Sequence, residues 1–316
     1  MSSPKLFITG GSGYIGSVVI EYALADGYIV TALSRAEPSD AKLQKLGATP
    51  VRGDLESFDV LESEAAKADV VINMADSMAS DHTLSMDERF AINNGAIAAL
   101  AAGLKGSGKP LIFTGGSLQA AADPRGKETD ESSPGWPEDH PLGWTLRGWR
   151  KSLVHAENGV GAMYVRLAPY VYGRGKSGVA LFMGMWSRAG AGFFIDEGKA
   201  RTTTIHVEDA ARLYLLLAQK GWAGESYNGT SETHVTQGEI ARAICRSINV
   251  PCHSLSCQEA ASRGPLANFF SAENRASNKK AREELGWEIK AEKGILDEIR
   301  TGSYVRVAEK LRKADA

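Results

Sequence analysis

The amino-acid sequence predicts an α/β protein in which a doubly wound parallel sheet is joined to a smaller C-terminal α+β lobe. Short apolar, β-branched segments alternate with helical patterns through the first two-thirds of the 316 residues, and the connections are short. This alternation predicts a parallel sheet with helices on both faces. A glycine-rich stretch, TGGSGYIG at 9–16, follows the first apolar segment. Beyond residue 171 the alternation stops, which indicates a separate lobe.

Six apolar segments are the expected strands, and helices are expected between them. In chain order, we expect the strands at 6–8, 29–33, 49–52, 70–74, 111–114 and 162–167. We expect the helices at 17–25, 41–46, 61–66 and 88–104, with others toward the C-terminus at 237–249 and 276–285. Asp26-Gly27 and Gly47 are expected to end the first two helices.

The expected domain division follows this pattern. Residues 1–170, with 200–224 returning to them, form a dinucleotide-binding domain, and 171–199 together with 225–316 form a substrate-binding lobe. We expect the lobe over the carboxyl edge of the sheet, where open α/β sheets bind ligands.

Composition limits the classes of partner. The chain is 43% hydrophobic and 23% charged with a net charge of −2, so it offers no field that would attract nucleic acid or an anionic membrane. No apolar run is long enough for a signal peptide or a membrane-spanning helix. We therefore expect a cytoplasmic protein with a small-molecule substrate and neither a nucleic-acid nor a membrane partner.

Three cysteines, Cys245, Cys252 and Cys257, lie close together in the sequence. Without a secretory signal we do not expect disulfides. Cys252, His253 and Cys257 match no common zinc spacing, so we predict packing thiols and no metal site.

The glycine stretch predicts a dinucleotide site. Gly10, Gly13 and Gly16 form G-x-x-G-x-x-G between a strand and a helix. The first glycine permits a tight turn, the second lets the backbone approach a pyrophosphate, and the third allows close helix packing. The amides of Gly13, Tyr14 and Ile15 are expected to face the anionic group at the helix N-terminus.

The end of the second strand distinguishes the two forms of the cofactor. A protein that binds NAD usually places an acidic residue there for the ribose 2′-hydroxyl. This chain has Ser34 in that place, followed by Arg35, whose planar cation suits a 2′-phosphate. The sequence therefore favours NADP(H) over NAD(H), and the alternative is that Arg35 is a solvated loop residue.

Further motifs follow in order along the chain. They are Ser34-Arg35, Gly53-Asp54-Leu55, VINMA at 71–75, Asn93, RLAPYVYG at 166–173, IHVEDAA at 205–211 and ELGW at 284–287. With these motifs the chain resembles the extended short-chain dehydrogenase/reductase family, in its NAD-dependent epimerase/dehydratase branch, over nearly the whole length. The resemblance implies the Rossmann form of the doubly wound fold and a possible homodimer. The cofactor contacts it implies, from adenine to nicotinamide, are Asp54, Leu55, Met74, Ala75, Pro169 and Tyr170.

The family's chemistry rests on a tyrosine and a lysine four residues apart on one helix. The matching segment here is TLRGWRKSL at 145–153, with Lys151 in the lysine position and Arg147 in the tyrosine position. The resemblance implies that Lys151 also holds the nicotinamide ribose. Arginine is a poor proton donor because its pKa exceeds 12, yet it can stabilise negative charge as a fixed cation. The alternative is that both residues are solvated surface cations.

The family also uses a serine or threonine at the end of the fifth strand. Its register falls on Gly116, so Thr114, which would also adjoin the cofactor, and Ser117 are the alternatives. Tyr170 is a candidate proton donor near the nicotinamide. Tyr172 and His206 are others, although a structural role is favoured for both, and Asp81-His82 is weaker still.

These residues support three hypotheses for function. The first is an NADP(H)-dependent oxidoreductase for a hydrophobic or aromatic carbonyl or alcohol, with an apolar pocket built from Trp144, Phe182, Met183, Met185, Trp186, Phe193 and Phe194. The second is a redox-silent isomerase, cyclase or dehydratase that keeps NADP(H) as a structural cofactor. The third is a non-enzymatic NADP(H) sensor.

Overall fold

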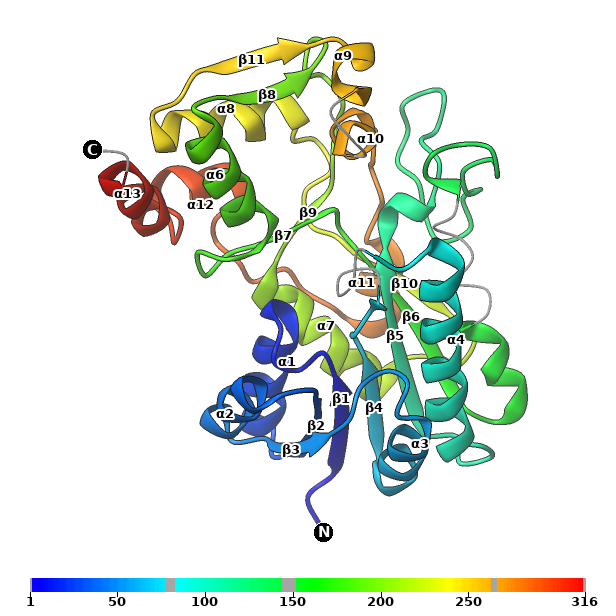
Figure 1. Ribbon diagram of the computed structural model, residues 1–316. Coiled ribbons are helices and arrows are strands. Elements are labelled where there is room, and N and C mark those ends of the chain that lie inside the picture. The colour runs from blue at the N-terminus through cyan, green and yellow to red at the C-terminus, as the bar shows by residue number, and fades with distance from the viewer. Residues whose placement is uncertain (1, 78–82, 144–151, 263–265, 315–316) are drawn as a thin grey trace. The chain divides into compact units, whose positions relative to one another are not determined.

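The computed structural model describes residues 2–77, 83–143, 152–262 and 266–314 (Figure 1). The chain divides into two compact units. The first contains Met1–Gly115, Thr145–Arg166 and Ala211–Tyr227, and the second contains Gly116–Trp144, Leu167–Ala210 and Asn228–Ala316.

Three segments that the sequence assigned to the dinucleotide-binding domain, 116–144, 167–170 and 200–210, cluster with the second unit, and residues 225–227, assigned to the lobe, cluster with the first. Backbone hydrogen bonds explain this placement, because Thr129 N donates to Arg275 O at 3.0 Å and Thr204 N donates to Glu232 O at 3.1 Å. The division by function stays a prediction.

A seven-stranded sheet organises the first unit. Its strands in chain order are β1 (Lys5–Thr9), β2 (Ile29–Ser34), β3 (Thr49–Arg52), β4 (Val70–Asn73), β5 (Pro110–Gly116), β6 (Gly161–Leu167) and β10 (Ser226–Gly229). Their order across the sheet is β10-β6-β5-β4-β1-β2-β3. The register is parallel, with Leu6 opposite both Val30 and Val70. The predicted doubly wound parallel sheet is thus confirmed, and β10 is the strand that the sequence did not predict.

Helices cover both faces of this sheet. They are α1 (Tyr14–Ala25), α2 (Glu37–Leu46), α3 (Phe58–Lys67), α4 (Met86–Gly103) and α7 (Val207–Lys220), with a 3₁₀ turn at Val154–Asn158. Leu61 of α3 and Leu100 of α4 share a buried cluster with Phe7 and Phe113, so α3 and α4 cover one face (Figure 1). Ile20 of α1 packs beside Ile8 and Ala32 around Gly11, which places α1 on the other face. Strands buried on both faces explain the near-continuous apolar segments.

Local signals set the ends of these helices. Pro38 lies in the first turn of α2, and Gly47 ends that helix in the left-handed conformation (φ 95°). Ser85 and Glu88 form a reciprocal capping box at the start of α4. Three helices, α1, α2 and α3, begin three or four residues earlier than the apolar pattern predicts.

The second unit contains the C-terminal α/β region expected after the sheet. It contains two parallel strand pairs, β7 (Tyr170–Tyr172) with β9 (Thr204–His206) and β8 (Gly192–Ile195) with β11 (Cys252–Leu255). Its helices are α6 (Ser177–Ala189), α8 (Gln237–Ile248), α9 (Cys257–Ala261), α10 (Leu266–Ser271), α11 (Lys279–Leu285), α12 (Ile295–Thr301) and α13 (Val305–Ala314), with a 3₁₀ turn at Ser117–Gln119.

Aromatic rings form the core of this unit. Phe182 stacks on Trp186 with ring centroids 5.8 Å apart, and Phe270 lies 5.1 Å from Phe182. Phe182, Met183, Trp186 and Phe194 are buried, and Met185 and Phe193 pack against them. Among the described residues these side chains therefore serve mainly as core; Trp144, expected in the same apolar set, lies outside the described residues.

The described residues also bear on the question of membrane and metal sites. None of the described helices combines the length and the apolar composition that crossing a membrane requires. No group of three or more His, Cys, Asp or Glu side chains in that part of the chain is arranged to hold a metal ion.

Candidate functional site

The glycine turn between β1 and α1 leaves no room for side chains. Gly10 has a φ of +72°, and a Cβ there would lie 2.9 Å from Ala75 N. A Cβ on Gly16 would lie 2.3 Å from Gly10 O. The first and third glycines therefore have the roles predicted for them, a left-handed turn and close packing of the helix.

The second glycine needs a correction. The N–H of Gly13 donates to Gly10 O at 3.0 Å and closes the turn, so this amide is not aimed at a ligand. Helix α1 begins at Tyr14, and the first amides of a helix have no acceptor within it. Tyr14 and Ile15 therefore remain the predicted anion-facing amides, and the helix dipole adds positive potential there.

A cavity of about 450 Å³ adjoins this turn, within the usual size range of ligand pockets. It brings together seven of the predicted cofactor residues, namely Gly10, Gly13, Arg35, Asp54, Leu55, Met74 and Ala75. The other lining residues were not predicted; they are Ser12, Leu33, Ser39, Glu56, Asp76, Ser77, Leu84 and Ile92. We call this cavity the nucleotide pocket.

Ser34 and Arg35, at the end of β2, differ in burial and in their position relative to the nucleotide pocket. Ser34 is 2% exposed, its Oγ donates to Ala36 O at 3.4 Å, and it does not line the nucleotide pocket. Arg35 does line the pocket, and its side chain is exposed. Nearby, Arg52 donates to Ser34 O and forms an ion pair with Asp40. Among the described residues, no carboxylate forms an ion pair with Arg35.

Asp54 lies on the same pocket in a fixed orientation. Its carboxylate accepts hydrogen bonds from Ser57 Oγ at 2.8 Å and Glu56 N at 3.0 Å. These bonds, above all that from Ser57, hold the pKa of Asp54 below its ordinary value of 3.8. Asp54 is therefore an ionised acceptor at neutral pH.

The end of β4 is held by one buried hydroxyl. Thr9 Oγ1 donates to Asn73 Oδ1 at 2.6 Å and accepts from the amides of Met74 at 3.1 Å and Ala75 at 3.0 Å. Thr9 is fully buried. This arrangement fixes the backbone where Met74 and Ala75 line the nucleotide pocket.

Asn93 of α4 orients the next part of the pocket wall. Its Nδ2 donates to Asp76 Oδ1 at 2.8 Å, and its Oδ1 accepts from Ser77 N at 3.0 Å. The sequence includes Asn93 among the family motifs but does not predict Asp76. The available signal for Asp76 was its position directly after the VINMA strand end.

The hydroxyl candidates for catalysis lie in different surroundings. Thr114 Oγ1 is 2.8 Å from the hydroxyl of Tyr214, which is fully buried and whose pKa is raised by that burial. Ser117 is 1% exposed and donates to Asn274 Oδ1 at 2.9 Å, with Thr203 Oγ1 3.3 Å away. The contacts of Ser117 favour a structural role in the second unit.

The tyrosine and histidine candidates are also enclosed. Tyr170 donates to Gln237 Oε1 at 2.7 Å, and burial raises its pKa, so it is a weak proton donor in this state. Tyr172 donates to Lys293 O at 2.8 Å and meets the ring of His206 edge-on. Burial lowers the pKa of His206. These contacts agree with the structural role favoured for Tyr172 and His206.

Several predicted residues lie outside the described part of the chain. They are Asp81, His82, Arg147 and Lys151. Pro169 is half-buried and directly precedes β7.

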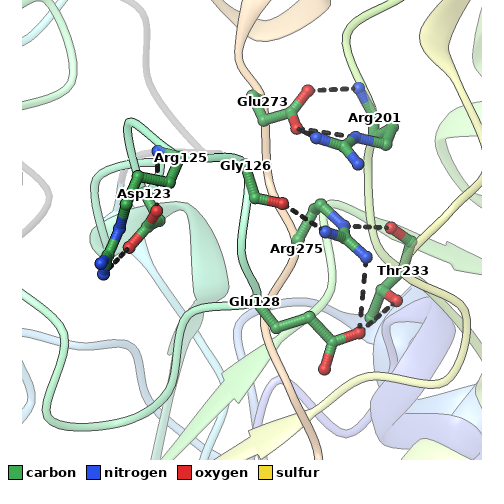
Figure 2. A network of polar contacts seen from close by, with 8 residues as sticks. All are labelled: Asp123, Arg125, Gly126, Glu128, Arg201, Thr233, Glu273 and Arg275. Atoms are coloured by element: carbon green, nitrogen blue, oxygen red, sulfur yellow. Dashed lines mark hydrogen bonds and ion pairs between the residues drawn. The ribbon is translucent and has the colours of Figure 1, made fainter.

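An unpredicted polar network joins distant segments of the second unit (Figure 2). Glu273 accepts from Arg201 N and Arg201 Nε, both at 2.8 Å. Arg275 donates to Thr233 O at 3.1 Å and to Gly126 O. The network fastens the 116–144 segment to the C-terminal part of the unit. Because the arginine donors are used within the protein, we assign the network to structure.

The comparisons with known proteins identify the family. The model of the NAD dependent epimerase/dehydratase family matches residues 6–228. The chain belongs to this family. An NAD(P) cofactor is typical of its members.

Relatives extend this result. The uncharacterized protein YLL056C of Saccharomyces cerevisiae is 32% identical over 302 residues, 94% of this chain and 98% of the yeast protein. A 4-hydroxy-2-methyl-3-oxo-4-farnesyl-3,4-dihydroquinoline-1-oxide ketoreductase of Stigmatella aurantiaca is 28% identical over 225 residues, 71% of this chain and 67% of that enzyme. The structure of dTDP-glucose 4,6-dehydratase from Bacillus anthracis superposes with a TM-score of 0.75 at 17% identity, over 98% of this chain and 97% of that one, and confirms the fold.

Proposed function

We propose that the protein is an NADP(H)-dependent oxidoreductase acting on a small hydrophobic or aromatic carbonyl or alcohol. The observation that carries the proposal is the position of Arg35 on the nucleotide pocket, exposed and without an ion-pair partner among the described residues. A guanidinium in this place suits the 2′-phosphate that distinguishes NADP from NAD. Ser39 on the same wall adds a hydroxyl donor.

The remainder of the nucleotide pocket fits a dinucleotide. The start of α1 suits the pyrophosphate, and Gly10 and Gly13, which line the pocket without side chains, leave room for its approach. Leu33 and Leu55 supply apolar contacts at the adenosine end. Lys151 would hold the nicotinamide ribose, as the family resemblance implies.

The proposed chemistry uses few protein groups. NADP(H), when bound, supplies or accepts the hydride. Arg147 polarises the substrate oxygen as a fixed cation, helped by Thr114, whose hydroxyl retains capacity beyond its bond to Tyr214. Ser117 and Tyr170 were alternatives for these tasks, but their buried hydrogen bonds support neither as the first choice. In this proposal water exchanges the proton.

The substrate class rests on a relative. The Stigmatella aurantiaca enzyme is named as the ketoreductase of a farnesylated dihydroquinoline, a ring ketone that carries an apolar chain. Its similarity over 71% of this chain supports a hydrophobic or aromatic carbonyl as the substrate.

Turnover of a substrate panel tests the proposal. The purified protein is mixed with NADPH and a series of aromatic ketones and enones, and nicotinamide absorbance is followed. We expect NADPH consumption with at least one apolar ketone, and a fall in kcat/KM of about 10² in Arg147→Ala, the usual loss for one charge-stabilising donor. Arg125→Ala is the matched control, since Arg125 is exposed and pairs only locally with Asp123.

One sequence observation supports a second candidate. Arginine in the tyrosine position suits a redox-silent isomerase, cyclase or dehydratase that retains NADP(H) as a structural cofactor. Substrate turnover without any change in nicotinamide absorbance would select this candidate. Cofactor binding without turnover of any substrate would select the third hypothesis, a non-enzymatic NADP(H) sensor.

A further inference from the structure

The second unit brings two of the three cysteines together at one glycine. Cys245 lies in the last turn of α8, and Cys252 is the first residue of β11. Cys252 is the register partner of Gly192 in the β8–β11 pair. A Cβ on Gly192 would lie 2.4 Å from the Cys245 sulfur. Both thiols therefore adjoin Gly192, and they lie within hydrogen-bonding reach of each other.

The turn between α8 and β11 fixes this approach. Asn249 ends the helix in the left-handed conformation (φ 59°), and Val250 N donates to Cys245 O at 3.0 Å. The chain thus folds back on the helix directly before Cys252. A disulfide between the two residues would close a short loop that is already formed.

The two thiols differ in surroundings. Cys245 is 1% exposed within the apolar core, whereas Cys252 is half-buried at its edge. The hydrogen bond from Cys245 and the charge of Arg242 lower the pKa of Cys252, while that bond and burial raise the pKa of Cys245. Arg242 is held in place by stacking over the Phe194 ring, 4.1 Å from its centroid. Cys252 is therefore the partly exposed thiol with the lowered pKa, and Cys245 is its sheltered neighbour.

We propose that Cys245 and Cys252 form a reversible dithiol–disulfide site that is oxidised by hydrogen peroxide. The Cys252 thiolate attacks the O–O bond, becomes a sulfenic acid and releases hydroxide. The Cys245 thiol then attacks that sulfur, the S–S bond forms, and water leaves. Overall the two thiols lose two hydrogens and one peroxide is reduced to two waters. A dithiol reductant reverses the step by thiol–disulfide exchange. This site is independent of the proposed oxidoreductase activity.

Peptide mapping of the full-length protein tests the site. Reduced protein is treated with a small excess of hydrogen peroxide, alkylated under denaturing conditions and digested. We expect a linked Cys245–Cys252 species lighter by two hydrogens, with Cys257 still alkylated. Dithiothreitol should restore all three alkylation sites.

Single substitutions distinguish the role of Cys252, which attacks the peroxide, from that of Cys245, which attacks the resulting sulfenic acid. Cys245→Ser should stop at a sulfenic acid on Cys252 that dimedone traps, and Cys252→Ser should leave Cys245 reduced. Arg242→Gln should slow alkylation of native Cys252 by about threefold, because a neighbouring cation is lost. Cys257→Ser is the matched control and should form the same link as the wild type.

Two results would overturn the proposal. One is complete alkylation of both Cys245 and Cys252 after peroxide treatment while Cys257 is oxidised. The other is over-oxidation of Cys252 to sulfinic acid in the wild type, which would show that Cys245 does not reach it. Both readouts are masses of peptides, so they are unaffected by whether the protein turns over NADPH.

Discussion

The nucleotide pocket and the second unit are built in different ways. The pocket is assembled from the ends of neighbouring strands, and most of its lining residues come from short stretches of sequence: Gly10 to Gly13, Arg35 to Ser39, Asp54 to Glu56 and Met74 to Ser77. The second unit has an aromatic core and hydrogen bonds between residues that are far apart in the chain, such as those between Ser117 and Asn274. Local sequence motifs therefore determine the nucleotide pocket, whereas tertiary contacts determine the second unit. Substitutions in the pocket should affect cofactor binding, and substitutions in the second unit should affect mainly the free energy of unfolding.

The largest effect is expected at Gly16. A valine there would place its Cβ 2.3 Å from Gly10 O, in backbone that cannot move without opening the turn. We expect a loss of about 3 kcal/mol or more in the free energy of unfolding, together with loss of NADPH binding. Thermal unfolding and calorimetry measure the two effects.

Gly184→Ala is the matched control for this change. Gly184 lies in α6, and the nearest atom to an added Cβ is the end of the Arg188 side chain at 3.5 Å. Alanine should leave stability unchanged or slightly raised, because glycine weakens a helix. An equal loss in both variants would contradict the steric argument.

A smaller loss in the free energy of unfolding is expected from a substitution at Asn274. Its side chain accepts from Ser117 and donates to Ser117 O at 3.1 Å, in a fully buried setting. Asn274→Ala should cost about 2 kcal/mol, since it leaves buried polar groups without partners. Chemical denaturation measures this cost. Ser117→Ala should lower stability and leave kcat unchanged; a selective loss of kcat would instead make Ser117 catalytic.

Thr9→Val tests the floor of the nucleotide pocket. The variant keeps the shape of Thr9 but removes the hydroxyl that Asn73 and the amides of Met74 and Ala75 use. We expect a loss of about 1–2 kcal/mol in stability and weaker NADPH binding. Thr83→Val, outside the pocket lining, is the control. Unchanged cofactor affinity in Thr9→Val would show that this hydroxyl does not shape the pocket.

The smallest effect concerns pH. Because hydrogen bonds depress the pKa of folded Asp54 below 3.8, its contribution to stability is present above that value and is lost as pH falls through the folded pKa. Asp54 is exposed, so solvent screening limits the contribution to a few tenths of a kcal/mol. The wild type should exceed Asp54→Ala in unfolding free energy at pH 7, and the difference should shrink toward pH 3. A difference that grows on acidification would reverse the assignment.

The sequence carried the fold and most of the nucleotide pocket because both depend on local patterns. Strand–helix alternation predicted the parallel sheet, and the glycine spacing located the turn at Gly10 and Gly16. The Gly13 amide was wrongly predicted to face the anionic group, because a G-x-x-G-x-x-G pattern does not reveal which N–H closes the turn. Asp76 was missed because its orientation depends on Asn93, which lies on helix α4, distant from it in the sequence.

The side-chain contacts of the second unit could not be predicted from the sequence, for a physical reason. The contacts of Ser117 and Tyr170 are made with Asn274 and Gln237, whose positions follow from tertiary packing. Residue type and spacing do not reveal that these two hydroxyls are already hydrogen-bonded, so both were predicted as candidates for catalysis. The aromatic residues of α6 likewise looked like pocket walls, and they pack on one another as core.

The most direct test of the account is a comparison of NADPH with NADH by titration calorimetry on the wild type and on Arg35→Ala. We predict that the wild type binds NADPH at least tenfold more tightly than NADH, and that Arg35→Ala binds the two equally while its affinity for NADH is unchanged. Lys45→Ala, on the same α2 region but outside the pocket lining, should behave as the wild type. Equal affinity of the wild type for both cofactors, or no binding of either, would contradict the account.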